Sequence, residues 1–336
     1  MDHYSREIVN WFRKWRYFGL AKNDFPPYAT IQVIQCFDWY TLGGVMKFVT
    51  FRAGGERRVG VCDDQSASVR PVSLSSDDAR SGVAALLGRD LTQLELLSAI
   101  PLDSVQLEAP FPRPTRNIFC IGKNYREHAR EFSRSGFDSS AAMGEIPKHP
   151  IIFSKVPECV IAHGDDVMLD PSVSEAVDYE AELAVIIGTG GRNISVEDAM
   201  AHVWGYTIVN DVTARDLQGR YSQWLVGKSQ DTFCPMGPIA VTADEIDAGD
   251  TDLRCIVNGE VRQTANTRDL IFDIPTIIAT ISAGVTLIPG DIIATGTPAG
   301  VGIGFTPPKY LRDGDVVRIE IDGIGALENR FVERRA

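Results

Sequence analysis

The chain has 336 residues, which is long enough for a large hydrophobic core and for one to three domains. Its hydrophobic content of 44% and charged content of 23% are typical of a globular protein. The net charge of −12 argues against nucleic acid or an anionic membrane as a partner, and no segment approaches the roughly 18 consecutive apolar residues of a membrane span. A small anionic substrate is not excluded, because a metal ion or local lysines can reverse the field within one cleft.

The cysteines are scattered, and no C-x-x-C pair occurs. The six are Cys36, Cys62, Cys120, Cys159, Cys234 and Cys255. Several lie in apolar runs, where a reduced cysteine is a small hydrophobic side chain. We therefore predict reduced thiols in a cytoplasmic setting and no zinc site.

Residues 1–45 differ in character from the rest of the chain, because tryptophan and tyrosine alternate with basic residues there. We interpret them as an extension from an upstream start, poorly packed or disordered, with Met46 as the natural beginning. A basic-aromatic amphipathic helix that binds a surface is the alternative. A signal peptide is not expected, because no apolar core with a cleavage site follows a charged segment.

Residues 46–112 predict a small accessory α+β domain. The runs 47–52 and 57–62 read as two strands joined by a glycine turn, which is a hairpin signal. Short helices are expected at 83–87 and 91–97. The proline-rich segment 109–115 resists helix formation and marks the end of this unit.

Residues 113–336 are rich in predicted strands and poor in helices. Strands are expected at 117–122, 151–155, 181–187, 203–209, 238–242, 253–257, 261–264, 291–294, 316–321 and 324–332. Asn258-Gly259 and Asp322-Gly323 predict hairpin turns. Helices are expected at 124–134, 195–202 and 268–282, the last with Thr267 as N-cap. Strands and helices do not alternate regularly, so we predict a strand-rich α+β fold with a mixed, rolled or barrel-like sheet.

The segment 177–188 contains two acidic residues that flank the start of an apolar, β-branched run. Side chains alternate along a strand, so Glu180 and Glu182 point to the same face, about 7 Å apart. Two such carboxylates at a buried strand repel each other unless a cation lies between them. Because the donors are oxygens, the pattern predicts Mg²⁺ or Mn²⁺. The alternative is a solvated strand end with two unrelated acids.

Asp211 is the candidate third ligand. It follows the apolar strand 203–209, at the end where it can meet two acids of a neighbouring strand. The alternative is that it caps the short helix that follows. Three carboxylates leave about three of the six octahedral positions of Mg²⁺ for water or substrate.

His128 and Glu131 are three residues apart on the helix predicted at 124–134, and they therefore lie on one face. A carboxylate beside an imidazole fixes its tautomer and raises its basicity, as a general base requires. The alternative is a surface ion pair.

Two further segments are candidates for binding an anion. Lys228 lies among glycine and small polar residues, where it either turns inward toward an anion or is a solvated loop residue. The glycines of 294–304 let backbone N–H groups approach a carboxylate or a phosphate. A nucleotide loop is disfavoured because no G-K-[ST] motif is present, and a serine hydrolase is disfavoured because G-x-S-x-G is absent.

Five motifs occur in the order found in the fumarylacetoacetate hydrolase superfamily: G-x-N-Y-x-x-H-x-x-E, Y-E-x-E-L, N-D-V-T-A-R-D-L-Q, G-K-S-x-D and T-G-T-P-x-G-V-G. The chain resembles the smaller members of that superfamily from roughly residue 115 to 330. No acid occurs between Ile118 and Arg126, where larger animal-type members carry a fourth metal ligand. The segment 133–150 is long, so the shape of the lid and the choice of substrate do not carry over.

The resemblance implies a β-roll catalytic domain at 113–336, usually in a homodimer. It further implies Mg²⁺ or Mn²⁺ on Glu180, Glu182 and Asp211, a His128–Glu131 dyad on a mobile lid, Lys228 as an anion-stabilising group, and Lys155, Gln218 and Thr297 as substrate contacts.

The implied substrates are small anionic 2-oxo acids, whose enolate a metal stabilises. Hydrolysis of a C–C bond in an acylpyruvate or fumarylpyruvate is placed first, with His128 deprotonating the attacking water. Isomerisation of a hydroxymuconate-type diacid and tautomerisation or decarboxylation of oxaloacetate are the alternatives within the superfamily. A non-catalytic binding member of the fold is a more remote one.

Overall fold

The structure is a computed structural model that describes residues 46–63, 66–134 and 146–334. These residues belong to one compact unit. The predicted extension 1–45 and most of the predicted lid segment 133–150 lie outside the described residues. The division between 46–112 and 113–336 stays a prediction, and a sheet runs continuously across it.

The first strands form a meander at one end of a large sheet. Gly54 and Gly55 both have positive φ and make the tight turn of the predicted first hairpin. The strands are β1 (Lys47–Ala53), β2 (Glu56–Asp63), β3 (Ser68–Pro71), β4 (Ile100–Pro101) and β5 (Gln106–Glu108). Short helical turns cover them: α3 (Ser76–Ala79), η1 (Gly82–Leu86), η2 (Leu91–Gln93) and η3 (Leu102–Ser104). The predicted helix 91–97 is therefore limited to its first turn.

The large sheet continues into the part of the chain with the predicted site. Its order is β4-β3-β2-β1-β15-β12-β11-β18-β6-β7, with β5 also paired to β1. The added strands are β6 (Ile118–Gly122), β7 (Ile151–Lys155), β11 (Ala181–Ile187), β12 (Val203–Asn210), β15 (Ile239–Thr242) and β18 (Ile292–Ala294). Only β18 and β6 are parallel among these neighbours. The path ends at β4 and β7, so the sheet does not close into a barrel.

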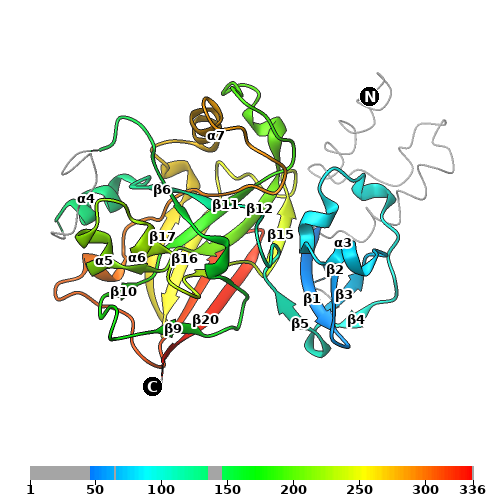
Figure 1. Ribbon diagram of the computed structural model, residues 1–336, viewed down its shortest axis with the longest axis horizontal. Helices are drawn as coiled ribbons and strands as arrows, with labels where there is room; N and C mark the ends of the chain where they lie inside the picture. The colour runs from blue at the N-terminus through cyan, green and yellow to red at the C-terminus, as the bar shows by residue number, and fades with distance from the viewer. Residues whose placement is uncertain (1–45, 64–65, 135–145, 335–336) are drawn as a thin grey trace, which may run out of the picture. The chain divides into compact units, whose positions relative to one another are not determined.

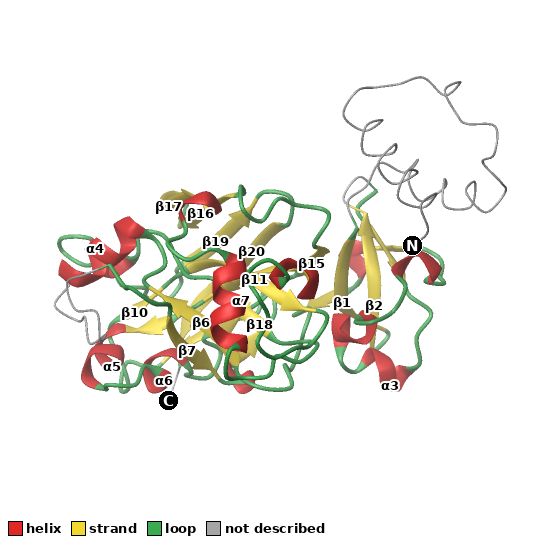
Figure 2. Ribbon diagram, turned by 90° about the horizontal axis from the view of Figure 1, so that it is seen from above, coloured by secondary structure: helices red, strands yellow, loops and turns green. Residues whose placement is uncertain are grey.

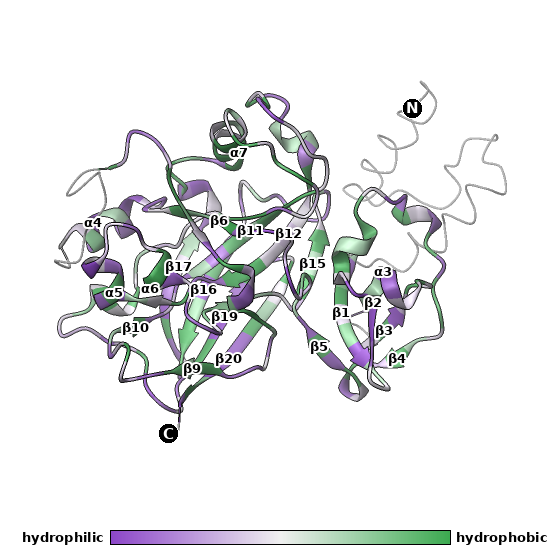
Figure 3. Ribbon diagram, viewed as in Figure 1, coloured by the Kyte–Doolittle hydropathy of each residue, from purple (hydrophilic) through white to green (hydrophobic). Residues whose placement is uncertain are grey.

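A second sheet packs against this one (Figures 1 and 2). Its order is β17 (Glu260–Asn266), β16 (Asp252–Val257), β19 (Val316–Ile321), β20 (Gly325–Glu333) and β9 (Val167–Leu169). The two predicted hairpin turns occur here, and Asn258 and Gly259 both have positive φ, as a type I′ turn requires. Leu183 of β11 and Ile319 of β19 belong to one buried cluster between the sheets, where Figure 3 shows hydrophobic colour along the strands. The predicted strand-rich α+β fold is confirmed.

Two pairs of very short strands lie beside the sheets: β10 (Val177–Asp178) with β13 (Thr213–Ala214), and β8 (Val160–Ile161) with β14 (Cys234–Pro235). The helical elements of this part are α4 (Arg126–Arg134), η4 (Pro157–Cys159), η5 (Ala199–His202), α5 (Arg215–Arg220), α6 (Leu225–Lys228), η6 (Thr267–Asp269), α7 (Ile274–Ser282) and η7 (Gly302–Gly304).

Two further helix predictions are wrong in their extent. Helix α7 begins at Ile274 rather than near 268, and its N-cap is Asp273, whose side chain accepts from Thr276 N. Pro275 explains the start, because proline is favoured in the first turn of a helix and disfavoured further inside. The predicted helix 195–202 is reduced to the 3₁₀ turn η5. No helix in the described part of the chain is long and apolar enough to cross a membrane.

Candidate metal and acid–base site

The register of two buried strands brings three carboxylates together. Strand β11 pairs antiparallel with β12, so that Ala181 lies opposite Asn210. Asp211 N donates to Glu180 O at 2.9 Å, which places Asp211 beside Glu180 at the same end of the sheet. One oxygen of each of Glu180, Glu182 and Asp211 lies within 4.8 Å of the others, and all three residues are buried.

Both alternative interpretations of these acids are therefore excluded. Glu180 and Glu182 are 4% and 1% exposed, so they do not form a solvated strand end. Asp211 does not cap the following helix, because the N-cap position of α5 is Ala214. The pleat of the strand and its burial together produce the predicted carboxylate cluster.

Buried cations surround two of the three carboxylates. Lys228 Nζ donates to Glu180 Oε2 and Asp211 Oδ2, both at 2.7 Å. Arg215 Nη1 lies 2.6 Å from Glu180 Oε1. Burial alone raises the pKa of Glu180, but Lys228 and Arg215 outweigh it and lower that pKa to about 2. Glu180 is therefore ionised at neutral pH.

Glu182 is in a different electrostatic position. Its Oε2 accepts from Gly296 N at 2.8 Å. Burial, followed by the repulsion of Asp211 and Glu180, raises the pKa of Glu182 well above its ordinary value. A divalent cation at the triad would compensate this excess of negative charge. An all-oxygen donor set fits Mg²⁺ or Mn²⁺, so the residues present are suited to the predicted ion.

His128 and Glu131 lie on α4, as predicted. His128 Nδ1 is 3.3 Å from Glu131 Oε2, and the Glu131 carboxylate also accepts from Gly300 N at 3.1 and 3.2 Å. His128 is only 4% exposed, so this is not a surface ion pair. A carboxylate on Nδ1 fixes the tautomer that carries its proton there, and Nε2 is then the basic nitrogen.

The glycine-rich loop 294–304 holds the protein's own carboxylates. Besides the bonds of Gly296 to Glu182 and of Gly300 to Glu131, Gly302 N donates to Asp178 Oδ1 at 2.6 Å. The sequence predicts that backbone N–H groups of this loop approach a carboxylate or a phosphate. In the structure, the carboxylates that they bind are side chains of the protein itself. This loop therefore orients Glu182, Glu131 and Asp178. Asp178 in turn holds Arg215, whose Nε donates to Asp178 Oδ2 at 2.8 Å.

A small cavity joins the triad and the dyad. Six of the predicted site residues line it: His128, Glu180, Glu182, Gln218, Lys228 and Thr297. Gln218 Oε1 accepts from Arg215 Nη1 at 3.1 Å, and Thr297 Oγ1 accepts from Gln263 Nε2 at 2.8 Å. Both side chains are thereby fixed at the wall of the cavity, where a substrate contact is possible.

Glu131, Lys155 and Asp211 are predicted site residues that do not line this cavity. Lys155 is fully buried, and its ammonium donates to Asp211 Oδ1 at 2.7 Å, to Val212 O at 3.0 Å and to Lys228 O. Burial lowers the pKa of Lys155, but the attraction of Asp211, added to that of the nearby cysteines Cys159, Cys234 and Cys120, outweighs burial and makes the net shift upward. These contacts make Lys155 a support for Asp211, and its predicted contact with substrate stays a prediction.

Sequence reasoning gave no role to several residues of the site. Arg215 lies in the same motif as Asp211, N-D-V-T-A-R-D-L-Q, and this shared motif is the sequence feature that could have indicated its role. Its Nη2 is buried and has no hydrogen-bond acceptor among the described residues. Lys123 and the aromatic residues Phe132, Phe153 and Trp224 also line the cavity, and only the three-dimensional arrangement brings them there.

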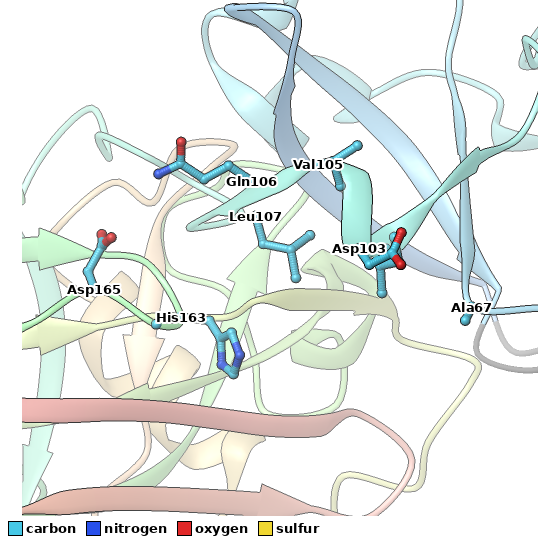
Figure 4. Close-up of a pocket in the computed structure, with 9 residues that line it drawn as sticks. Ala67, Asp103, Val105, Gln106, Leu107, His163 and Asp165 are labelled. Atoms are coloured by element: carbon cyan, nitrogen blue, oxygen red, sulfur yellow. The ribbon is translucent and has the colours of Figure 1, made fainter.

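A more open hollow on the surface shares no lining residue with this cavity (Figure 4). Apolar Leu102, Val105 and Leu107 lie along it together with His163 and Asp165. His163 Nδ1 accepts from Glu328 N at 3.0 Å, so this nitrogen is already hydrogen-bonded to the backbone of β20. Among the described residues, the group suited to a metal is the carboxylate triad instead.

Comparison with known proteins identifies the family of this chain. The family profile for the fumarylacetoacetate (FAA) hydrolase C-terminal region matches residues 117–332. The chain belongs to the fumarylacetoacetate hydrolase family. A solved fumarylacetoacetate hydrolase from psychrophilic Exiguobacterium antarcticum has 40% sequence identity and a TM-score of 0.72, covering 86% of this chain and all of that one.

Two curated relatives in this family carry a more specific name. Oxaloacetate tautomerase YisK of Bacillus subtilis is 53% identical over 231 residues, which are 68% of this chain and 74% of the relative. The human mitochondrial oxaloacetate tautomerase FAHD2A is 38% identical over 313 residues, which are 92% of this chain and 94% of the relative.

The raised pKa of Glu182 predicts a pH-dependent stability. Glu182 keeps its proton in the folded, metal-free protein above the pH at which the unfolded chain loses it. The stability that this group contributes is therefore complete below its ordinary pKa of 4.5 and is lost as the pH rises toward the folded value. The increase in Tm on adding Mg²⁺ or Mn²⁺ should grow as the pH rises above the ordinary pKa of 4.5, since the ion replaces a proton.

Glu182→Gln isolates this effect. The amide cannot ionise, so the metal-free variant should lose stability less steeply with pH than the parent, and it should show little metal-induced shift in Tm. Glu197→Gln, at an exposed residue, is the matched control and should behave as the parent. Equal metal-induced shifts in the parent and in Glu182→Gln at every pH would show that Glu182 is not a ligand.

Proposed function

We propose that this chain catalyses the keto–enol tautomerisation of oxaloacetate or of a closely similar 2-oxo dicarboxylate. The observation that carries the proposal is one buried cavity lined by a histidine base and by two carboxylates of a metal-type triad. The names of the two curated relatives support this reaction among those that such a cavity can serve.

The reaction needs the removal of a proton from carbon and its delivery to oxygen. A bound Mg²⁺ or Mn²⁺ withdraws electron density from the 2-oxo group and so makes the hydrogens on C3 more acidic. His128, with its Nδ1 proton directed to Glu131, has Nε2 available to take a proton from C3 and to give it to the oxygen on C2. The atoms balance, because one C–H bond breaks and one O–H bond forms.

Cationic side chains stabilise the substrate and the charge that develops on it. The buried Nη2 of Arg215 lacks an acceptor among the described residues and is suited to a substrate carboxylate. Lys228 offers a fixed ammonium at the same wall, where negative charge on the C2 oxygen would be stabilised in a site of low dielectric constant. Because Glu180 holds both cations, binding requires little reorganisation.

Hydrolysis of an acylpyruvate, the reaction that the resemblance in sequence favours, is the second candidate. The name of the Exiguobacterium antarcticum structure favours it. Hydrolysis uses the same carboxylates and the same base, but it requires in addition a water that attacks the distal carbonyl. The curated relatives favour the tautomerase alternative, which needs no such water.

The direct test follows the ultraviolet absorbance of enol oxaloacetate as it converts to the keto form. The metal-loaded protein should accelerate this decay, EDTA should abolish the acceleration, and added Mg²⁺ or Mn²⁺ should restore it. An acylpyruvate should be cleaved slowly or not at all in the same buffer. Rapid cleavage of the acylpyruvate without an effect on oxaloacetate would reverse the assignment.

The position of Gly304 allows the dyad to be tested without removing either member. A Cβ at Gly304 would overlap the Glu131 carboxylate, so Gly304→Ala should displace Glu131 from His128. We expect kcat for tautomerisation to fall by about 10- to 100-fold, since the base loses its orientation. The concentration of Mg²⁺ that gives half-maximal activity should not change, because the triad is untouched.

Gly284→Ala is the matched control, because a Cβ there would contact nothing within 4 Å. It should retain the activity of the parent, and circular dichroism should show both variants folded. A fully active Gly304→Ala variant would remove the dyad from the proposed mechanism.

A further inference from the structure

Lys123 occupies an unusual backbone position at the entrance to α4. It directly follows β6 and has a φ of +54°, a left-handed conformation that side-chain-bearing residues rarely adopt. Such strain persists where the surroundings fix it, and it is frequent at functional sites. The lysine is also 3% exposed, which is unusual for this residue type.

The residues on either side hold Lys123 in place. A Cβ at Gly122 would lie 2.7 Å from the ring of Trp224, so the backbone there passes directly against the indole. Asn124 Nδ2 donates to Phe272 O at 3.0 Å and to Thr295 O at 2.8 Å, and Asn124 Oδ1 accepts from Phe272 N. The direction in which the Lys123 side chain leaves the backbone is therefore set by its neighbours.

That direction leads into the cavity of the triad and the dyad. Lys123 lines it, and its Nζ lies 5.6 Å from the centre of the Phe132 ring. Phe132 and Phe153 both contact Trp224 edge-on, with ring centres 6.2 and 5.2 Å apart, and the three form an aromatic wall. The cavity thus has a carboxylate end at Glu180 and Glu182 and an aromatic wall to which Lys123 adds a positive charge.

The carboxylate end and the aromatic wall of this cavity suit the two ends of one kind of substrate. The 2-oxo acid end belongs near the carboxylate triad, with Arg215 and Lys228 alongside. The remainder of the substrate then extends along the aromatic wall, which by itself favours an apolar substituent. A cation on this wall, in a site of low dielectric constant, instead favours a second carboxylate.

We propose that Lys123 is a specificity-determining residue, which binds the distal carboxylate of the substrate and so selects 2-oxo dicarboxylates over 2-oxo monocarboxylates. The proposal rests on the function proposed above and deepens it. A purely structural role, in which Lys123 fixes α4 by its contact with Phe132, would affect all ligands of the cavity alike.

The test compares two ligands that differ only at the distal group. Oxaloacetate carries a carboxylate where 2-oxobutyrate carries a methyl group, and both share the 2-oxo acid end. Dissociation constants are measured for both by calorimetry on the Mg²⁺-loaded full chain, together with the rate of enol oxaloacetate decay. The parent should bind oxaloacetate at least about tenfold more tightly than 2-oxobutyrate.

Three substitutions define the role of the ammonium. Lys123→Met should weaken oxaloacetate binding by about 10- to 100-fold, as expected for one buried hydrogen bond to a charged group, and should change 2-oxobutyrate binding by less than about twofold. Lys123→Gly removes the same charge and suits a positive φ, so it tests the proposal even if Lys123→Met does not fold. Lys123→Arg should retain the preference. Arg70→Met, which removes an exposed positive charge on β3, is the matched control and should bind both ligands as the parent does.

Equal weakening of both ligands in Lys123→Met and Lys123→Gly would overturn the proposal in favour of a structural role. Unchanged oxaloacetate binding, or a parent that does not distinguish the two ligands, would overturn it as well. If the parent binds oxaloacetate selectively but does not accelerate tautomerisation, the proposed function fails while the specificity of Lys123 stands. If the parent accelerates tautomerisation but binds both ligands equally, the proposed function stands and the specificity of Lys123 fails.

Discussion

The constraint on which this site depends is the burial of many charges with little water to solvate them. Glu180 and Asp211 each have two ammonium or guanidinium partners, and these partners are themselves buried. In such a setting, removing one member of a pair leaves an uncompensated charge, which typically costs about 3–5 kcal/mol. Burial and the repulsion of Asp211 and Glu180 raise the pKa of Glu182, which lies beside the place that suits a divalent ion, so the same buried charges that form the network also prepare the site for that ion.

Strands and loops contribute to the site in different ways. The β11–β12 register brings the three carboxylates to one end of a sheet, and this arrangement cannot shift by one residue without turning Glu180 and Glu182 to the other face. The base, by contrast, lies on a short helix next to residues that the structure does not describe. What joins the two is the loop 294–304, whose N–H groups bind Glu182 and Glu131 directly. The position and the tautomer of His128 thus depend on the same backbone loop that orients the carboxylate triad.

Local patterns were sufficient for most of the fold. The apolar run after Glu180 and the Asn258-Gly259 turn specify their own conformation, and the structure has strands and a hairpin there. The sequence alone does not locate the start of α7, because Asp273 and Thr267 are both residue types that cap helices well, and only Pro275 and the tertiary structure favour Asp273. Long-range pairing decided the rest of the site. That Arg215 binds Asp178, that Lys155 supports Asp211 from behind, and that Lys123 enters the cavity all depend on contacts between segments that periodicity does not connect.

The loop 294–304 has a consequence for redesign of this scaffold. Its bonds to Glu182, Glu131 and Asp178 come from the main chain, so they persist whatever side chains are chosen elsewhere, provided that the glycines remain. A transplanted α4 from another protein would need to satisfy few demands: a carboxylate within reach of Gly300 N, an imidazole one turn before it, and an aromatic ring in place of Phe132 against Trp224. The helix that carries the dyad is thus a separate unit for redesign, while the carboxylate triad on the strands is left untouched.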